Sequence, residues 1–362
     1  MQVHAQSEGR DAACAAEQLV RGATTAERRG AERLRARIAD LTTDAAARLD
    51  DRIRALLDHQ LGGMIDRIEL ALRERAARLL LTRGDRALAA RIRGGGDVAW
   101  PRLSEKRAID GAIVAELLAR LRHDLIAAGL PPGTGEDNVA SLLIRLTEIG
   151  DARVSAAARA LLVADSRRRE ALDFSPVTGS ELPAELHQQL VWRVAAAIRE
   201  DGAEGLDRAL AEAAHRIVAE HDEGERAEAV AMRLALAIDA RPEELAALID
   251  EALGDGRLSL IVAVLAQAGQ LSFEQVRNML VEPDDERWWL LLRAVGLDPL
   301  TVARIALALT GADSRRYADE LPDLLDAVNA VPVDNARAVL APLRLPADFR
   351  AAIEAIAREG RP

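Results

Sequence analysis

Signals for helix starts and helix stops alternate almost without a spacer in residues 256–311, and this stretch constrains the fold more than any other part of the chain. Its sequence is GRLSLIVAVLAQAGQLSFEQVRNMLVEPDDERWWLLLRAVGLDPLTVARIALALTG. Ser272 precedes Gln275 by three residues, with an apolar residue before the serine and another after the glutamine, which is the pattern of a capping box with a hydrophobic staple. Asp298 followed by Pro299 repeats the start signal, because proline is well tolerated at the first helical position.

Between these starts, glycines mark the expected helix ends. Gly269 and Gly296 each stand where a left-handed residue would close a helix. The helices that they delimit, at 258–268 and 286–295, are apolar nearly all round, which predicts buried core helices too short to span a membrane. Helices buried on every side need neighbours on every side, so the stretch predicts an array of packed helices.

Composition supports an all-α fold. Ala, Leu and Arg dominate, and the chain has only four Trp, three Phe and one Tyr among 362 residues, so the residues that favour strands are scarce. Cys14 is the only cysteine, which excludes an internal disulfide framework and fits a reducing compartment. The N-terminus lacks the pattern of a secretion signal and no long apolar run occurs, so we expect a cytoplasmic protein that does not enter a membrane.

The net charge of −11 is carried by the residues after position 100. An acidic chain with few aromatic side chains lacks both the clustered cations and the stacking surfaces that nucleic-acid binding uses, so no nucleic-acid partner is expected. Lys106 is the only lysine, and the base composition of a GC-rich genome explains the preference for arginine more simply than selection for bidentate contacts.

The periodicity divides the chain into three parts. Residues 1–23 lack sustained periodicity and are predicted to form a mobile tail. Residues 24–128 are predicted to form an N-terminal helical region. Its amphipathic stripe, residues 24–93, makes either a homodimer seam or, as we favour, a helical bundle or a long hairpin that bends at Gly62-Gly63. After a glycine- and proline-rich linker, residues 136–360 are predicted to form a helical-repeat domain.

The predicted N-caps of this last domain, Arg241, Ser272, Asp298 and Asp334, recur with a loose period. Such helical hairpins favour an irregular array of the HEAT kind, with an irregular helical bundle as the alternative.

Three runs carry a resemblance to a known family: LLIRLTEIGDARVSAAARALL, ELPAELHQQLVWRVA and LIVAVLAQAGQLSFEQVRNMLVEPDDERWWLLLRAVGL. They resemble the uncharacterised alphaproteobacterial proteins of the domain of unknown function 2336 family, over about residues 139–311. The resemblance implies an α-helical, HEAT-like fold and brings no known active-site residues.

No catalytic, cofactor-binding or metal-binding pattern stands out, so none of these sites and no cofactor is predicted. The glycine run at 94–96 lacks the spacing of a phosphate loop, and His215 with His221, six residues apart, fits no zinc motif. His187 lies among apolar residues and is expected to be a core histidine. His123 falls opposite the apolar face of its helix, so we expect it to be exposed, and the local string RHDL resembles the core of phosphotransfer helices in two-component signalling.

Trp288 and Trp289 point about 100° apart on one helix. Core packing is favoured for both, with contact to a protein partner as the alternative for one of them. These observations favour a non-enzymatic helical-repeat protein that acts as an interaction scaffold or regulator in bacterial signalling and binds a protein partner. The alternative function is that of a phosphotransfer or sensor component that uses His123.

Overall fold

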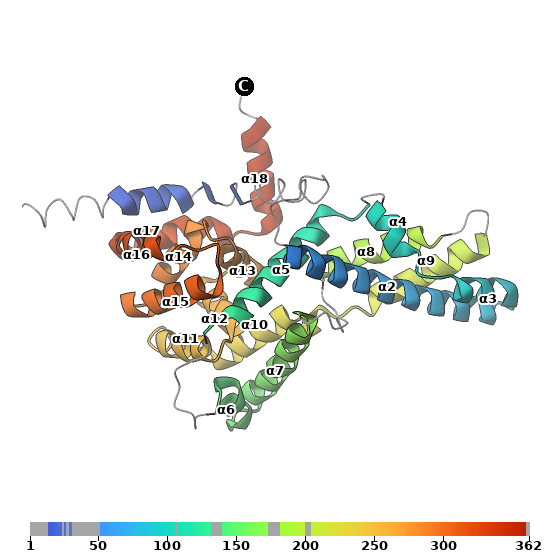
Figure 1. Cartoon of the computed structure of the whole chain (residues 1–362), viewed down its shortest axis with the longest axis horizontal. Helices are drawn as coiled ribbons and strands as arrows, with labels where there is room; N and C mark the ends of the chain where they lie inside the picture. The colour runs from blue at the N-terminus through green and yellow to red at the C-terminus, as the bar shows by residue number, and fades with distance from the viewer. Residues whose placement is uncertain are drawn as a thin grey trace, which may run out of the picture. The chain divides into compact units, whose positions relative to one another are not determined.

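The structure is a computed structural model in which every regular element of the described residues is a helix, and no strand is found among them (Figure 1). The described residues are 14–23, 25–26, 29–30, 51–105, 108–131, 140–172, 182–199 and 204–359. The prediction of an all-α helical array is confirmed. Within the described ranges, no helix combines the length and the apolar character that a membrane span requires.

The chain divides into two compact units that do not follow the predicted division. Unit 1 comprises Met1–Arg33, Arg122–Leu162 and Val230–Pro362, and unit 2 comprises Leu34–Leu121 and Val163–Ala229. Periodicity assigns neighbouring residues to one domain, but helices that are distant in the sequence pair with each other here. Residues 163–229 therefore cluster with the N-terminal region and not with the repeats that follow them.

Unit 2 is organised around one long helix, α2 (Asp51–Thr82). It packs against α3 (Arg86–Gly94), α4 (Ala99–Glu105), α8 (Ala184–Ala197) and α9 (Glu204–Ala219). The unit also holds the first part of α5 (Gly111–Gly129), the last part of α7 (Ala152–Leu172), η1 (Glu223–Glu225) and the start of α10 (Ala227–Ile238). Leu56, Ile65 and Leu72 of α2 are fully buried, so the part of the amphipathic stripe that lies on α2 is covered within the chain.

The predicted bend at Gly62-Gly63 is wrong, because α2 runs through both glycines without a break. Their neighbours Leu61 and Met64 are buried, and this packing outweighs the low helix propensity of glycine. The hairpin exists, but its turn lies about twenty residues later, at Gly84, which has a φ of +83°. The part of the predicted stripe at 31–50 lies outside the described residues.

A buried ion pair on α2 holds the ends of two neighbouring helices. Glu69 and Arg73 are 1% and 7% exposed, and the guanidinium donates to the carboxylate over 2.5 and 2.8 Å. Arg73 also donates to the carbonyls of Ile92 and Gly96, while the Glu69 carboxylate accepts the Ala99 N–H at the start of α4. The glycine run is thus a turn around a guanidinium, and a Cβ at position 95 would overlap it.

Unit 1 contains α6 and the C-terminal helices of the predicted repeat domain, together with the remaining parts of α5, α7 and α10. Its complete helices from α6 onward are α6 (Leu142–Glu148), α11 (Leu245–Gly254), α12 (Leu258–Gly269), α13 (Phe273–Val281), α14 (Glu286–Ala294), α15 (Pro299–Ala312), η2 (Ala318–Glu320), α16 (Leu321–Ala330), α17 (Val333–Leu340), η3 (Ala341–Arg344) and α18 (Ala347–Glu359). α11 packs on α12, α12 on α13, and α13 on α14. The array is irregular, because α14 also packs on α12, α16 and α17, and α11 packs on α15.

The two strongest start signals are confirmed. Ser272 and Gln275 exchange both hydrogen bonds of a capping box, and the Asp298 carboxylate accepts the N–H groups of Leu300 and Thr301. Gly296 has a φ of +85° and closes α14 as predicted.

Three other expected boundaries are wrong. Gly269 is helical, and the left-handed residue is Gln270, with a φ of 56°. Glycine is favoured at 269 for a different reason, since a Cβ there would lie 2.7 Å from Leu291. The predicted N-caps Arg241 and Asp334 are not caps, because α11 begins after Glu244 and α17 begins after Pro332.

Arginines brace the C-terminal ends of successive helices in unit 1. Arg344 donates to the carbonyl of the last residue of α12 over 3.2 Å, Arg315 to that of α13 over 2.9 Å, and Arg337 to that of α14 over 3.0 Å. The last carbonyls of a helix have no partner in their own helix, so a guanidinium from another element satisfies them. These contacts tie elements 34, 43 and 75 positions apart in the sequence.

The predicted mobile tail is wrong for residues 14–23, which are helical. Ala16, Leu19 and Ala23, and further on Ala26, are buried. Their spacing of three, four and three residues forms one helical face, which was overlooked because alanine contrasts weakly with its polar neighbours. Residues 1–13 lie outside the described part of the chain.

Candidate interaction surfaces

His123 does not have the exposure expected of it. Its residue is 0% exposed, its Nδ1 lies 3.1 Å from Oδ1 of Asp124, and its ring centroid lies 6.1 Å from that of Phe273. The prediction assumed that α5 buries one face only, but Arg120 and Arg122 on its polar side are buried as well. A buried imidazole lacks the open approach that a phosphoryl donor needs.

Ion pairs make the burial of these polar residues possible. Arg122 donates to Glu282 over 2.9 Å in unit 1. In unit 2, Glu228 is 2% exposed and is paired with Arg120 and Arg168. Buried charges are tolerated only when they are paired. These residues therefore hold helices together through their ion pairs, and their charged groups are engaged within the protein.

Trp288 and Trp289 are both buried, with 1% and 4% exposure. The Arg316 guanidinium lies 5.9 Å from the centroid of the Trp289 ring. Both indoles therefore belong to the core of unit 1, and neither presents a surface to a partner.

The remaining histidines named from the sequence form no metal site. His187 and His221 stack with ring centroids 3.9 Å apart, and Nε2 of His221 lies 2.9 Å from the Leu182 carbonyl oxygen. Burial and the neighbouring His221 lower the pKa of His187 to about 4. His215 instead meets Trp192 edge-on at 4.9 Å. Among the described residues, no group of three or more His, Cys, Asp or Glu is placed to hold a metal ion.

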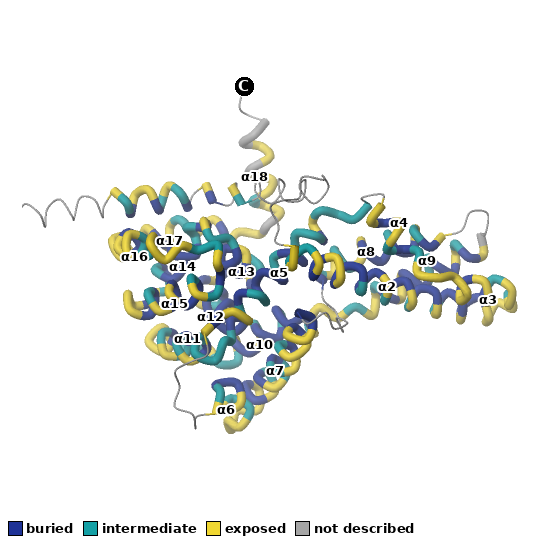
Figure 2. The backbone as a smooth tube through the Cα atoms, in the orientation of Figure 1, coloured by how far each residue is buried: buried dark blue, intermediate teal, exposed yellow. Residues whose placement is uncertain are grey.

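An exposed apolar face runs along α18. Phe349, Ile353 and Ile356 are 55%, 46% and 71% exposed, and their spacing of four and three residues places them on one side of the helix. Figure 2 shows α18 exposed over most of its described length, and the neighbour against which it mainly packs is the short η3. This helix lies within the predicted helical-repeat domain, but the periodicity of the sequence could not show that its apolar face stays uncovered.

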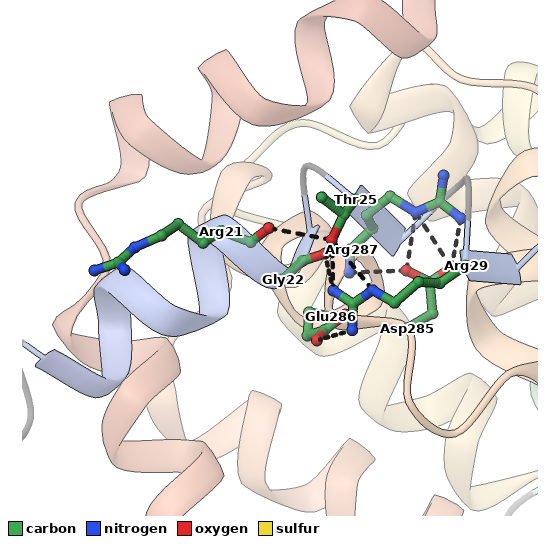
Figure 3. Close-up of polar contacts among 7 residues, drawn as sticks. All are labelled: Arg21, Gly22, Thr25, Arg29, Asp285, Glu286 and Arg287. Carbon is green, nitrogen blue, oxygen red and sulfur yellow. Dashed lines mark hydrogen bonds and ion pairs between the residues drawn. The ribbon is translucent and has the colours of Figure 1, made fainter.

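A second surface lies at the start of α14, where the N-terminal segment is seated (Figure 3). The term N-terminal segment denotes the described residues between 14 and 30. A Cβ at Gly22 would lie 2.8 Å from Cδ of Glu286, so the segment approaches α14 at a residue that has no side chain. The Arg29 guanidinium lies 3.4 Å from Oε1 of Glu286 and also donates to Thr25 and to the Gly22 carbonyl.

Comparison with known proteins identifies a family and goes no further. No curated protein and no solved structure matches the chain. One family model, described as an uncharacterised protein conserved in bacteria (DUF2336), matches residues 134–341, which is more than half of the chain and includes residues of both units. The chain therefore belongs to this bacterial family of helical proteins, the domain of unknown function 2336 family.

Proposed function

We propose that this chain is a non-enzymatic helical-array protein that acts as a protein-interaction scaffold or regulator in bacterial signalling, and that it works in the cytoplasm. The observation that carries the proposal is the exposed apolar face of α18. Large apolar side chains aligned on one face of a helix mark interaction sites, because water solvates them poorly. A scaffold acts by bringing other proteins together, which is why we place it in signalling.

The composition of α18 favours a protein partner over a membrane surface. Helices that lie on membranes are rich in Lys and Arg, whereas the sequence of α18, ADFRAAIEAIARE, holds two arginines and three acidic residues. An amphipathic helix with anchors at spacings of three, four and seven residues is the usual ligand of a hydrophobic groove in another protein. Phe349, Ile353 and Ile356 supply such anchors.

The test is capture of a partner from a lysate of the host by the full chain and by two variants. Ile356→Asp places a charge on the exposed apolar face of α18. Leu307→Asp makes the same kind of change at a residue of α15 that is 68% exposed, and serves as the matched control. Circular dichroism establishes that both variants keep the helical fold.

The proposal expects a reproducible protein that binds to the wild type and to Leu307→Asp and is lost with Ile356→Asp. It fails if no protein is captured reproducibly, or if Ile356→Asp captures the same proteins as the wild type.

Phosphotransfer through His123 gains no support from the geometry, since the imidazole is buried. A homodimer through residues 24–93 stays a prediction. It does not draw support from α2, whose apolar stripe is covered within the chain.

A further inference from the structure

The way in which the N-terminal segment binds beside Glu286 indicates what kind of helix this surface can bind. The segment presents a face of small side chains, Ala16, Ala23 and Ala26, with Leu19 as its one large apolar residue. Gly22 has no side chain, and a Cβ at this position would overlap the Glu286 carboxyl group. The arginine seven residues later reaches the Glu286 carboxylate. Shape and charge both contribute to this contact.

The contact is modest in strength, because its buried side chains are mostly single methyl groups. The ion pair is also part-exposed, with side-chain exposures of 43% for Arg29 and 24% for Glu286, so water and salt screen it. A segment that is held by so few contacts can leave its site without unfolding the rest of unit 1.

We propose that the surface at Glu286 is a helix-binding site that the chain occupies with its own N-terminal segment, and that a partner helix binds there by displacing it. The partner is an amphipathic helix with a small-residue face, a glycine at its closest approach to Glu286 and an arginine seven residues further on. The segment thereby regulates access to the site. This site does not depend on α18, so its failure leaves the function proposed above untouched.

The first measurement follows the segment in the full chain. Cys14 is the only cysteine and is exposed, so a nitroxide attached to it reports the mobility of the segment. Gly22→Leu places a branched side chain against the Glu286 carboxylate, which would have to move away from its position beside Arg29. Arg21→Leu is the matched control, because the side chain of Arg21 is 72% exposed. Gly22→Leu should give a mobile spectrum, and Arg21→Leu should keep that of the wild type.

The second measurement uses a fluorescent peptide with the sequence of residues 14–30, CAAEQLVRGATTAERRG, as the probe for the partner. In the wild type, only the fraction of molecules whose internal segment has left the site can bind the peptide. Gly22→Leu should release the segment and so raise the affinity of the full chain for the peptide by about tenfold or more. Glu286→Arg should weaken binding of the peptide in the Gly22→Leu background, because it places two arginines opposite each other. A peptide that carries Arg29→Glu should then restore it.

The proposal is overturned if Gly22→Leu leaves the Cys14 spectrum unchanged. It is also overturned if the affinity for the peptide is the same in Gly22→Leu and in the wild type, or if the charge exchange at positions 29 and 286 restores no binding.

Discussion

Replacing Glu69 by glutamine tests whether the buried ion pair of α2 organises unit 2. The carboxylate accepts hydrogen bonds from Arg73 and from the N–H groups of Val98 and Ala99, over 2.5 to 3.3 Å. Glutamine keeps the shape of the side chain and one carbonyl oxygen, but it leaves the guanidinium of Arg73 as a buried charge without its counter-ion. The acceptors that remain for Arg73 are all neutral: the carbonyls of Ile92 and Gly96 and the one oxygen of the glutamine side chain.

Breaking a buried ion pair costs about 3 to 5 kcal/mol in the free energy of unfolding. We expect Glu69→Gln to lie at the lower end, at about 3 kcal/mol, because Arg73 keeps its two carbonyl acceptors. The pair should also be coupled. The double variant Glu69→Gln, Arg73→Met should lose clearly less free energy of unfolding than the sum of the losses of the two single variants.

Urea denaturation followed by circular dichroism measures these free energies. Asp51→Asn on the same helix is the control, since Asp51 is 96% exposed at its side chain and its pair with Arg54 should contribute at most about 0.5 kcal/mol. A loss below about 1 kcal/mol for Glu69→Gln, or full additivity with Arg73→Met, would refute the reasoning.

Three further changes have defined outcomes. The pKa of His187 falls from 6.5 to about 4 on folding, so the unfolded chain binds the extra proton between these values. Stability therefore decreases as pH falls through this window, by about 1 to 2 kcal/mol after a discount for the partly exposed ring. Urea titrations at pH 7 and pH 4.5 should show this loss, and His187→Phe should lack it. Ser272→Ala removes half of the capping box and should cost about 1 kcal/mol, and an unchanged urea midpoint would argue against the cap. Trp288→Ala empties a site that is 1% exposed and should cost about 3 to 5 kcal/mol, whereas a loss below about 1 kcal/mol would contradict its core position.

The sequence was most informative where a single residue type can satisfy a local requirement. Ser272 and Asp298 cap their helices as predicted, because the bonds that they make reach only two or three residues along the chain. The bend predicted at Gly62 is absent, because burial of the neighbouring side chains decides the course of α2 and depends on residues of other helices; a Cβ at Gly62 would lie 3.6 Å from the ring of Trp100 in α4.

The candidate site residues depended on distant neighbours and were therefore harder to predict. The helical pattern placed His123 on a polar face, but it could not show that ion pairs such as that of Arg122 with Glu282, 160 positions away, bury that face. The surface at Glu286 was missed for a similar reason, because its occupant lies more than 250 positions earlier in the chain. A single amino-acid sequence does not show which of its distant segments pack against each other.

The arginine braces at the ends of α12, α13 and α14 have a consequence for the chemistry that the array tolerates. Arg337 and Arg344 each donate from Nε to a carbonyl at the end of a helix. A guanidinium presents five N–H donors in a fixed plane, whereas a lysine ammonium offers three donors on a flexible stem. Exchange of either residue for lysine preserves the charge but not the planar, rigid group of donors. The preference for arginine over lysine, which the base composition of a genome can explain, thus also supplies hydrogen bonds that link helices of the array. Arg→Lys is therefore not a conservative change at these positions.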